Sequence, residues 1–149
     1  MLLIIFQIIY WKLSLLFLVT YIPCNPMPLN FLQWVWKNGC PWDRETCLNA
    51  AAHGHLNCLR WARENGCLWD SDTCTFAAAC GHLSCLQWAR ENGCQWDRYT
   101  CEFAAAHGHL NCLQWARENG CPWDMDVCLY IASFHFPTEV VTWIESTFI

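Results

Sequence analysis

The 149-residue sequence has few charged side chains and no cluster of basic ones. Charged residues make up 14% of the chain, and 8 Lys and Arg against 13 Asp and Glu give a net charge of −5. Proteins that bind nucleic acids carry a basic patch or stripe that contacts the phosphate backbone. The sequence lacks such a patch, so we expect no nucleic-acid partner.

Motifs typical of catalysis and of metal binding are also missing. Outside the repeating pattern described below, the chain contains no Gly-rich phosphate loop, no Ser/His/Asp arrangement and no paired carboxylates. No Cys-x-x-Cys pair supplies the close ligand spacing of a structural zinc site. We therefore expect a chain that is not an enzyme and has no cofactor, no bound metal and no small-molecule substrate.

Cysteine and tryptophan, in contrast, are far more frequent than in ordinary proteins, with 13 Cys and 11 Trp. The odd number of cysteines argues against a framework of disulfides, as does the absence of a clear secretion signal. A free cysteine commonly behaves as a small buried apolar residue. We predict that most of these thiols lie in the core, and a disulfide between the two helices of one hairpin stays open as an alternative.

A pattern with a period of 27 residues organises the chain. Its fullest form is W-A-R-E-N-G-C-x-W-D, and residues 59–85 match residues 86–112 at 20 of 27 positions. This period is the length of one supersecondary unit and is too short for an independent domain. We divide the sequence into a hydrophobic segment (1–26) and a repeat domain (27–149). The repeat domain comprises a half repeat (29–43), three regular repeats (44–70, 71–97, 98–124) and a degenerate C-terminal repeat (125–149).

Each period predicts two short helices. Asp70 is a good N-cap for an Ala-rich first helix, which Gly81 ends in the left-handed conformation. An amphipathic second helix follows and stops at Asn92-Gly93. Helices of about ten residues are unstable alone, so each copy must bury its apolar face against the next. The predicted fold is all-α, a solenoid of stacked αα-hairpins.

The segments "TCTFAAACGHLSCLQWARENGC" and "TCEFAAAHGHLNCLQWARENGC" resemble the ankyrin repeat. They are closest to short, Trp- and Cys-rich ankyrin-like arrays of large DNA viruses, algae and oomycetes, and the similarity covers residues 31–145. Phe76 and Phe103 stand where the ankyrin pattern has His, and the shorter period leaves no room for the β-finger. The resemblance implies binding of a protein partner without catalysis, in the cytoplasm, or in the host cytoplasm if the chain is viral.

Residues that recur in the copies are predicted to be structural. One tryptophan of each copy fills the second helix face, and the other seals the loop against the next repeat, rather than forming a platform for a ligand. The second histidine of each period (His55, His82 and His109) is predicted to cap the turn or to bridge it to the next repeat. The arginine column (Arg63, Arg90 and Arg117) is predicted to reach the aspartate of a nearby loop. The structural set is Trp61, Trp69, Trp88, Trp96, Trp115, Trp123, Cys67, Cys94, Cys121, Asp70, Asp97 and Asp124.

Positions that vary between copies are predicted to form the surface for an unknown protein partner, because stacking brings them side by side on one face. Neutral drift at exposed positions is the alternative. The candidates are Ser71, Asp72, Thr75, Gln95, Arg98, Tyr99, Glu102 and Met125.

Two further functions stay open. The cysteine and histidine columns could make a metal- or redox-responsive protein, with sets such as Cys47, His53, His55 and Cys58. The six-residue separation of Cys47 and His53 on one helix, about 9 Å along its axis, argues against a zinc site. The second alternative is a remnant of a longer repeat array.

The first 22 residues include 18 apolar ones, enough to cross a bilayer as a membrane anchor. Lys12 near the middle costs roughly 2.5–3.5 kcal/mol on insertion. The segment lacks a basic start and a cleavage site, which argues against a removable signal peptide. Lys37 and Arg44 follow it and favour repeats that face the cytoplasm. The alternatives are an apolar cap on the half repeat and a translation start at Met27.

Overall fold

The computed structural model describes residues 29–39, 43–135 and 138–147, and throughout these residues its regular secondary structure is helical, without strands. The all-α prediction is therefore confirmed for this part of the chain. The helices are α2 (Leu29–Lys37), α3 (Arg44–Ala52), α4 (Leu56–Glu64), α5 (Ser71–Ala79), α6 (Leu83–Glu91), α7 (Arg98–Ala106), α8 (Leu110–Glu118), α9 (Met125–His135) and α10 (Thr138–Ser146).

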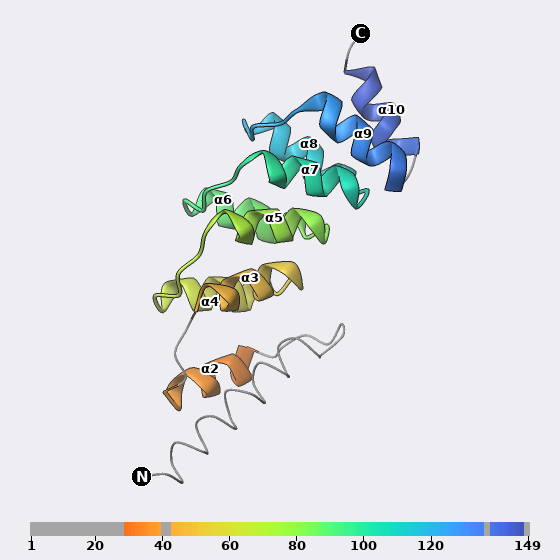
Figure 1. The fold of residues 1–149 in the computed structure, drawn as a ribbon. Coiled ribbons are helices and arrows are strands. Elements are labelled where there is room, and N and C mark those ends of the chain that lie inside the picture. The colour runs from red at the N-terminus through yellow and green to blue at the C-terminus, as the bar shows by residue number, and fades with distance from the viewer. Residues whose placement is uncertain (1–28, 40–42, 136–137, 148–149) are drawn as a thin grey trace, which may run out of the picture.

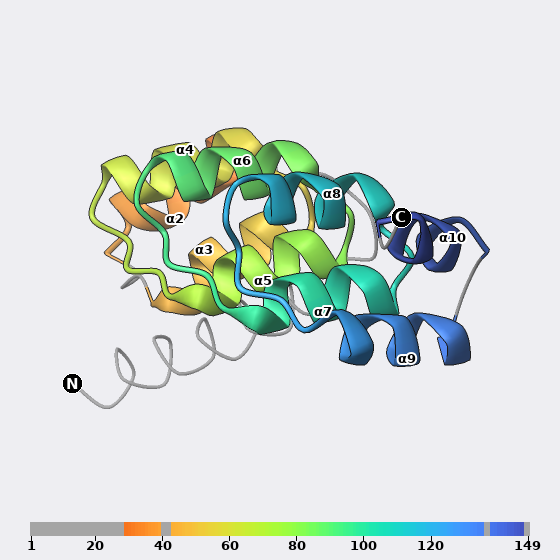
Figure 2. The same ribbon diagram turned by 90° about the horizontal axis from the view of Figure 1, so that it is seen from above.

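The helices form two layers (Figures 1 and 2). Helices α3, α5, α7 and α9 pack directly on one another in the first layer, and α2, α4, α6 and α8 follow one another in the second. Each first-layer helix also packs against the next helix of the chain, so that α3–α4, α5–α6, α7–α8 and α9–α10 are hairpins. Contacts between neighbours are denser in the first layer than in the second. The first layer is therefore the more continuous surface.

The first-layer helices begin at aspartate caps, as predicted. The aspartate carboxylate accepts a hydrogen bond from a backbone N–H of the first turn, at donor–acceptor distances of 3.0–3.2 Å. This bond satisfies one of the N–H groups that have no partner within the helix. The caps are Asp43, Asp70, Asp97 and Asp124.

The second-layer helices end at an Asn-Gly pair, and only the glycine enters the left-handed region. Gly93 has φ +85°, whereas Asn92 has φ −95°. The Asn92 side-chain amide instead donates a 2.8 Å hydrogen bond to the carbonyl of Trp88. The helix end is thus closed by a side chain and then turned by a glycine that accepts positive φ without strain.

The histidine after each turn contacts the preceding hairpin. A bridge between repeats was predicted, but its direction was wrong, because the prediction placed it toward the next repeat. The His109 ring lies against Gly81, where a Cβ atom would stand 2.6 Å from the ring Nδ1. The ring also hydrogen-bonds the backbone of Ala79 in that preceding hairpin. His82 makes the same contacts with Gly54 and Ala52. Burial lowers the pKa of both imidazoles below the usual value.

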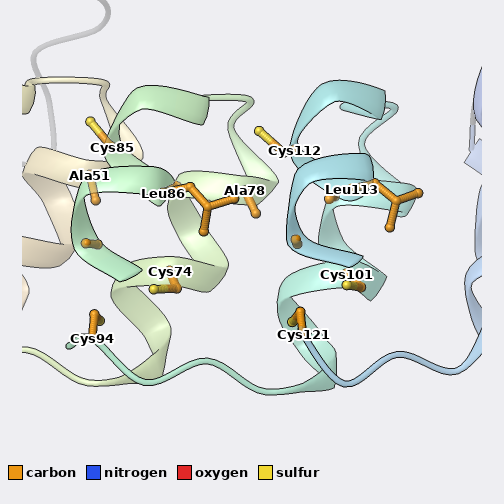
Figure 3. Close-up of a cluster of buried hydrophobic side chains, with 14 of the residues drawn as sticks. Ala51, Cys74, Ala78, Cys85, Leu86, Cys94, Cys101, Cys112, Leu113 and Cys121 are labelled. Atoms are coloured by element: carbon orange, nitrogen blue, oxygen red, sulfur yellow. The ribbon is translucent and has the colours of Figure 1, made fainter. Parts of the chain in front are cut away.

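Small side chains fill the core between the layers. Ala78 in the first layer and Leu86 and Leu113 in the second are fully buried (Figure 3). Ala105 in the first layer is also fully buried. Alanine lets the first-layer helices approach closely, which accounts for their denser contacts. The eleven cysteines among the described residues are free thiols, and all but Cys80 are buried. The prediction of buried thiols is confirmed for this part of the chain.

The predicted membrane anchor, residues 1–22, and the rest of the segment 1–26 lie outside the described residues. Among the helices that the structure describes, none is long and apolar enough to span a membrane.

Candidate protein-binding surface

The tryptophans join each loop to the next hairpin. Trp69, in the loop after α4, packs edge-on against Trp88 of α6, with ring centroids 5.7 Å apart. Trp96 and Trp115 repeat this contact one hairpin later, also at 5.7 Å. All four rings are partly buried against the core. The loop tryptophans therefore pack into the joints between hairpins, with their rings partly buried.

The arginine column makes contacts other than the predicted ones. The guanidinium of Arg63 lies 4.5 Å from the ring centroid of Trp69 and donates a 2.9 Å hydrogen bond to the carbonyl of Cys67. Arg90 makes the same two contacts with Trp96 and Cys94. The predicted pairing with a loop aspartate is wrong for these arginines, because the last helical turn places each guanidinium over an aromatic face, where cation–π attraction holds it.

The predicted partner positions separate into exposed and buried groups. Asp72, Gln95, Arg98 and Tyr99 are exposed. Ser71 is half-buried, and Met125 is half-buried against the core. These six remain available, at least in part, to a partner.

Thr75 and Glu102 do not belong to that surface, because they are only 6% and 8% exposed. The Thr75 hydroxyl lies 3.3 Å from that of Thr100 on the neighbouring helix α7. A Glu102 carboxylate oxygen lies 3.7 Å from Nε of Arg98. Burial raises the pKa of Cys128 on α9, and the charge of Glu102 raises it further. Both side chains face the next first-layer helix. These two variable positions therefore lie at contacts between helices and not on the exposed surface.

An exposed row of aromatic side chains crosses the first layer and was missed by the sequence reasoning. We call Phe76, Phe103, Tyr130 and Phe134 the aromatic row. Their exposed fractions are 41%, 40%, 65% and 67%. The first three occupy the same position on α5, α7 and α9, which pack side by side. Phe134 lies one turn beyond Tyr130, with ring centroids 4.8 Å apart.

A second row of exposed side chains lies one helical turn before the aromatic row. Glu45 on α3, Asp72 on α5 and Asp126 on α9 occupy it, and we call these three residues the acidic row. Tyr99 takes the equivalent position on α7 and is 45% exposed. The same face of the stacked helices therefore presents carboxylates beside aromatic rings.

The aromatic row is not revealed by the positions that differ between copies. Phe76 and Phe103 are the same residue in two copies, so a comparison of the copies shows them only as departures from the ankyrin pattern. A usable signal was present in the sequence. These residues lie four positions after Asp72 and Tyr99, and residues spaced by four share a helix face.

The described residues bring together no group of three or more His, Cys, Asp or Glu side chains able to hold a metal ion. In the candidate metal-binding set considered from the sequence, His53 stacks on His55 with ring centroids 6.0 Å apart. Cys47, by contrast, is buried against Cys67. The histidines and the thiol of one period thus have different neighbours.

Comparisons with known proteins found no family model and no curated sequence that matches the chain.

Proposed function

We propose that this chain is a non-enzymatic scaffold that binds a protein partner, built as a short ankyrin-like solenoid of αα-hairpins. The architecture is supported by the constant step between first-layer helices, which begin at residues 44, 71, 98 and 125. Stacked repeats of this kind present extended surfaces to which neighbouring units contribute equivalent residues. The aromatic row is the observation that carries the functional part of the proposal.

Exposed aromatic side chains at equivalent positions of three packed helices are typical of an interaction surface. Contiguous exposed apolar patches commonly mark binding sites, and aromatic residues are enriched among those that dominate binding energy. A single exposed aromatic ring is common on protein surfaces and needs no functional explanation. A functional explanation is favoured here, because successive copies place rings side by side on one face.

The acidic row sets the chemistry of the partner. Complementary charge selects among partners and speeds their association. Glu45, Asp72 and Asp126 favour a segment with Lys or Arg beside its apolar side chains, and the net charge of −5 favours it as well. The partner class is therefore a basic, apolar peptide segment.

The spacing of the helices favours an extended partner. Packed helices lie roughly 8–10 Å apart, so successive rings of the aromatic row are about that distance apart. A polyproline II segment has three residues per turn and rises about 3.1 Å per residue. It presents every third side chain to the same side at about 9 Å intervals, which matches one side chain to each first-layer helix.

Selection from a random peptide display library against the full chain tests this proposal. We expect enriched peptides with apolar residues at every third position and with Lys or Arg nearby. Gln95 lies in the loop before α7, and Arg98 and Tyr99 lie in the first turn of α7. All three are exposed and should adjust affinity among the selected peptides. Enrichment of acidic peptides would contradict the partner class, and failure to enrich any peptide would contradict the function itself.

A further inference from the structure

Three equivalent pairs of cysteines lie in the core, outside the proposed binding surface. Each pair joins a first-layer helix to the loop that follows the same hairpin. The pairs are Cys47–Cys67, Cys74–Cys94 and Cys101–Cys121. Five of the six thiols are fully buried, and Cys121 is 4% exposed. Figure 3 shows Cys74 beside Cys94 and Cys101 beside Cys121, at the end of the hairpin where the loop passes beneath the helix.

The two thiols of each pair lie within hydrogen-bonding reach of each other. The Cys74 thiol forms a hydrogen bond with the Cys94 sulfur, and the Cys94 thiol donates to the carbonyl of Asp70 at 3.1 Å. Because the Cys94 hydrogen points at that carbonyl, Cys74 is the donor of the thiol–thiol bond. The loop thiols of the other two pairs donate to the carbonyls of Asp43 and Asp97, both at 3.3 Å.

The two thiols of a pair differ in acidity. The hydrogen bond to Cys94, together with burial, raises the pKa of Cys74. The hydrogen bond that Cys94 accepts lowers its own pKa, against the effect of burial. The same contrast separates the other first-helix thiols from their loop partners. The loop thiol is therefore the group that forms a thiolate first, and the thiolate is the reactive form.

We propose that each of these pairs is a site of reversible oxidation to a disulfide, with a small-molecule disulfide such as oxidised glutathione as the oxidant. The loop thiolate attacks one sulfur of the oxidant, forms a mixed disulfide and releases one glutathione. The first-helix thiolate then attacks the protein sulfur of that mixed disulfide and releases the second glutathione. The pair loses two electrons and two protons, which the two glutathione thiols gain.

The other buried cysteines provide an internal comparison. Cys85 and Cys112 lie on the second-layer helices α6 and α8, and burial raises the pKa of each thiol to about 11. Equivalent residues on neighbouring helices are separated by about 8–10 Å, beyond the roughly 4.4–6.8 Å between Cα atoms that a disulfide spans. These thiols should stay reduced under conditions that oxidise the three pairs.

Burial determines how the pairs meet an oxidant. Thiols without exposed surface react only after local opening of the hairpin that covers them. Once formed, a disulfide such as Cys74–Cys94 would tie helix α5 to the loop after α6 and close one hairpin. Each disulfide would therefore restrict the opening of one hairpin. This effect does not depend on binding of the proposed partner.

The test is disulfide mapping on the full chain carrying Cys80→Ser, which removes the one exposed thiol among the described residues. The protein is equilibrated in glutathione buffers of graded oxidised fraction, alkylated, digested with trypsin and analysed by mass spectrometry. The tryptic peptide 91–98 holds Cys94 as its single cysteine. We expect it linked to peptide 64–90, with peptide 45–60 also linked to 64–90 and peptide 99–117 linked to 118–149. Fragmentation of the linked peptides identifies the bonded cysteines.

Matched variants assign the bonds. Cys74→Ala should abolish the link to peptide 91–98 and leave the Cys101–Cys121 bond, whereas Cys85→Ala should leave all three bonds. The map of the parent protein decides the question even if Cys74→Ala fails to fold. Bonds at Cys85 or Cys112 would overturn the proposal. So would complete alkylation of the paired cysteines in the most oxidising buffer.

Discussion

At the scale of single residues, the joint between hairpins depends on a glycine and a histidine. Gly81 combines a left-handed backbone, φ +75°, with close contact to the His109 ring. Gly93 has a similar φ of +85°, but a Cβ atom there would have no neighbour within 4 Å. Substitutions at these two glycines therefore distinguish the cost of backbone strain from the cost of a steric contact.

Gly81→Ala should therefore destabilise the protein more than Gly93→Ala. A left-handed alanine costs roughly 1–2 kcal/mol at either position. At Gly81 the new methyl group must also displace the histidine ring, for a total of about 2–4 kcal/mol. Urea unfolding followed by circular dichroism measures both variants. Equal losses of stability would contradict the account of the turn.

The histidines also predict a pH dependence. Burial lowers the pKa of His55, His82 and His109 in the folded protein below the unfolded value of 6.5. The unfolded chain then binds protons more readily, so stability is full above about pH 6.5 and falls as the pH drops below it. The denaturation midpoint should decrease between pH 7.5 and 5.5, a window above most carboxylate titration. The His82→Asn/His109→Asn variant should show a flatter profile, and an unchanged slope would refute this cause.

At the scale of helices, the first layer depends on alanine. Ala105 is fully buried in α7, and the adjacent Ala106 is only half-buried. Ala105→Leu adds volume to a packed interface and should destabilise the protein by about 1–3 kcal/mol. Ala106→Leu changes the same helix with almost the same helix propensity and should have an effect below about 1 kcal/mol. Thermal unfolding of both variants checks this, and similar losses would show that the interface is loose.

Most helices were predictable from the sequence, because capping and stop signals are local. Asp70 and Gly81 bracket α5, and the degenerate final copy still forms α9 and α10. The directions of Thr75 and Glu102 were not predictable, since variation between copies does not indicate which helix face meets the next repeat. The position of Arg63 depended on a competition between a carboxylate and an aromatic ring. Three-dimensional packing decides that competition.

At the scale of the whole molecule, outward and inward side chains have different chemistry. The aromatic row lies on the exposed face of the first layer, whereas the thiol pairs lie in the core. The general location of the proposed binding surface, at the start of the first helices, could be suggested from the sequence through Asp72 and Tyr99. Its aromatic part required the packing of α5, α7 and α9, which turns a recurring phenylalanine into a continuous row.

The most direct test of the scaffold proposal is the affinity of a peptide selected on the full chain for two double variants. Phe76→Ala/Phe103→Ala removes two rings of the aromatic row. Ser84→Ala/Asn111→Ala changes two exposed residues of the second layer and is the matched control. Truncation of a side chain that dominates binding costs about 2 kcal/mol or more, so titration calorimetry should show affinity at least about 10-fold weaker for the first variant and unchanged for the second. Equal affinities for the two variants would contradict the proposal.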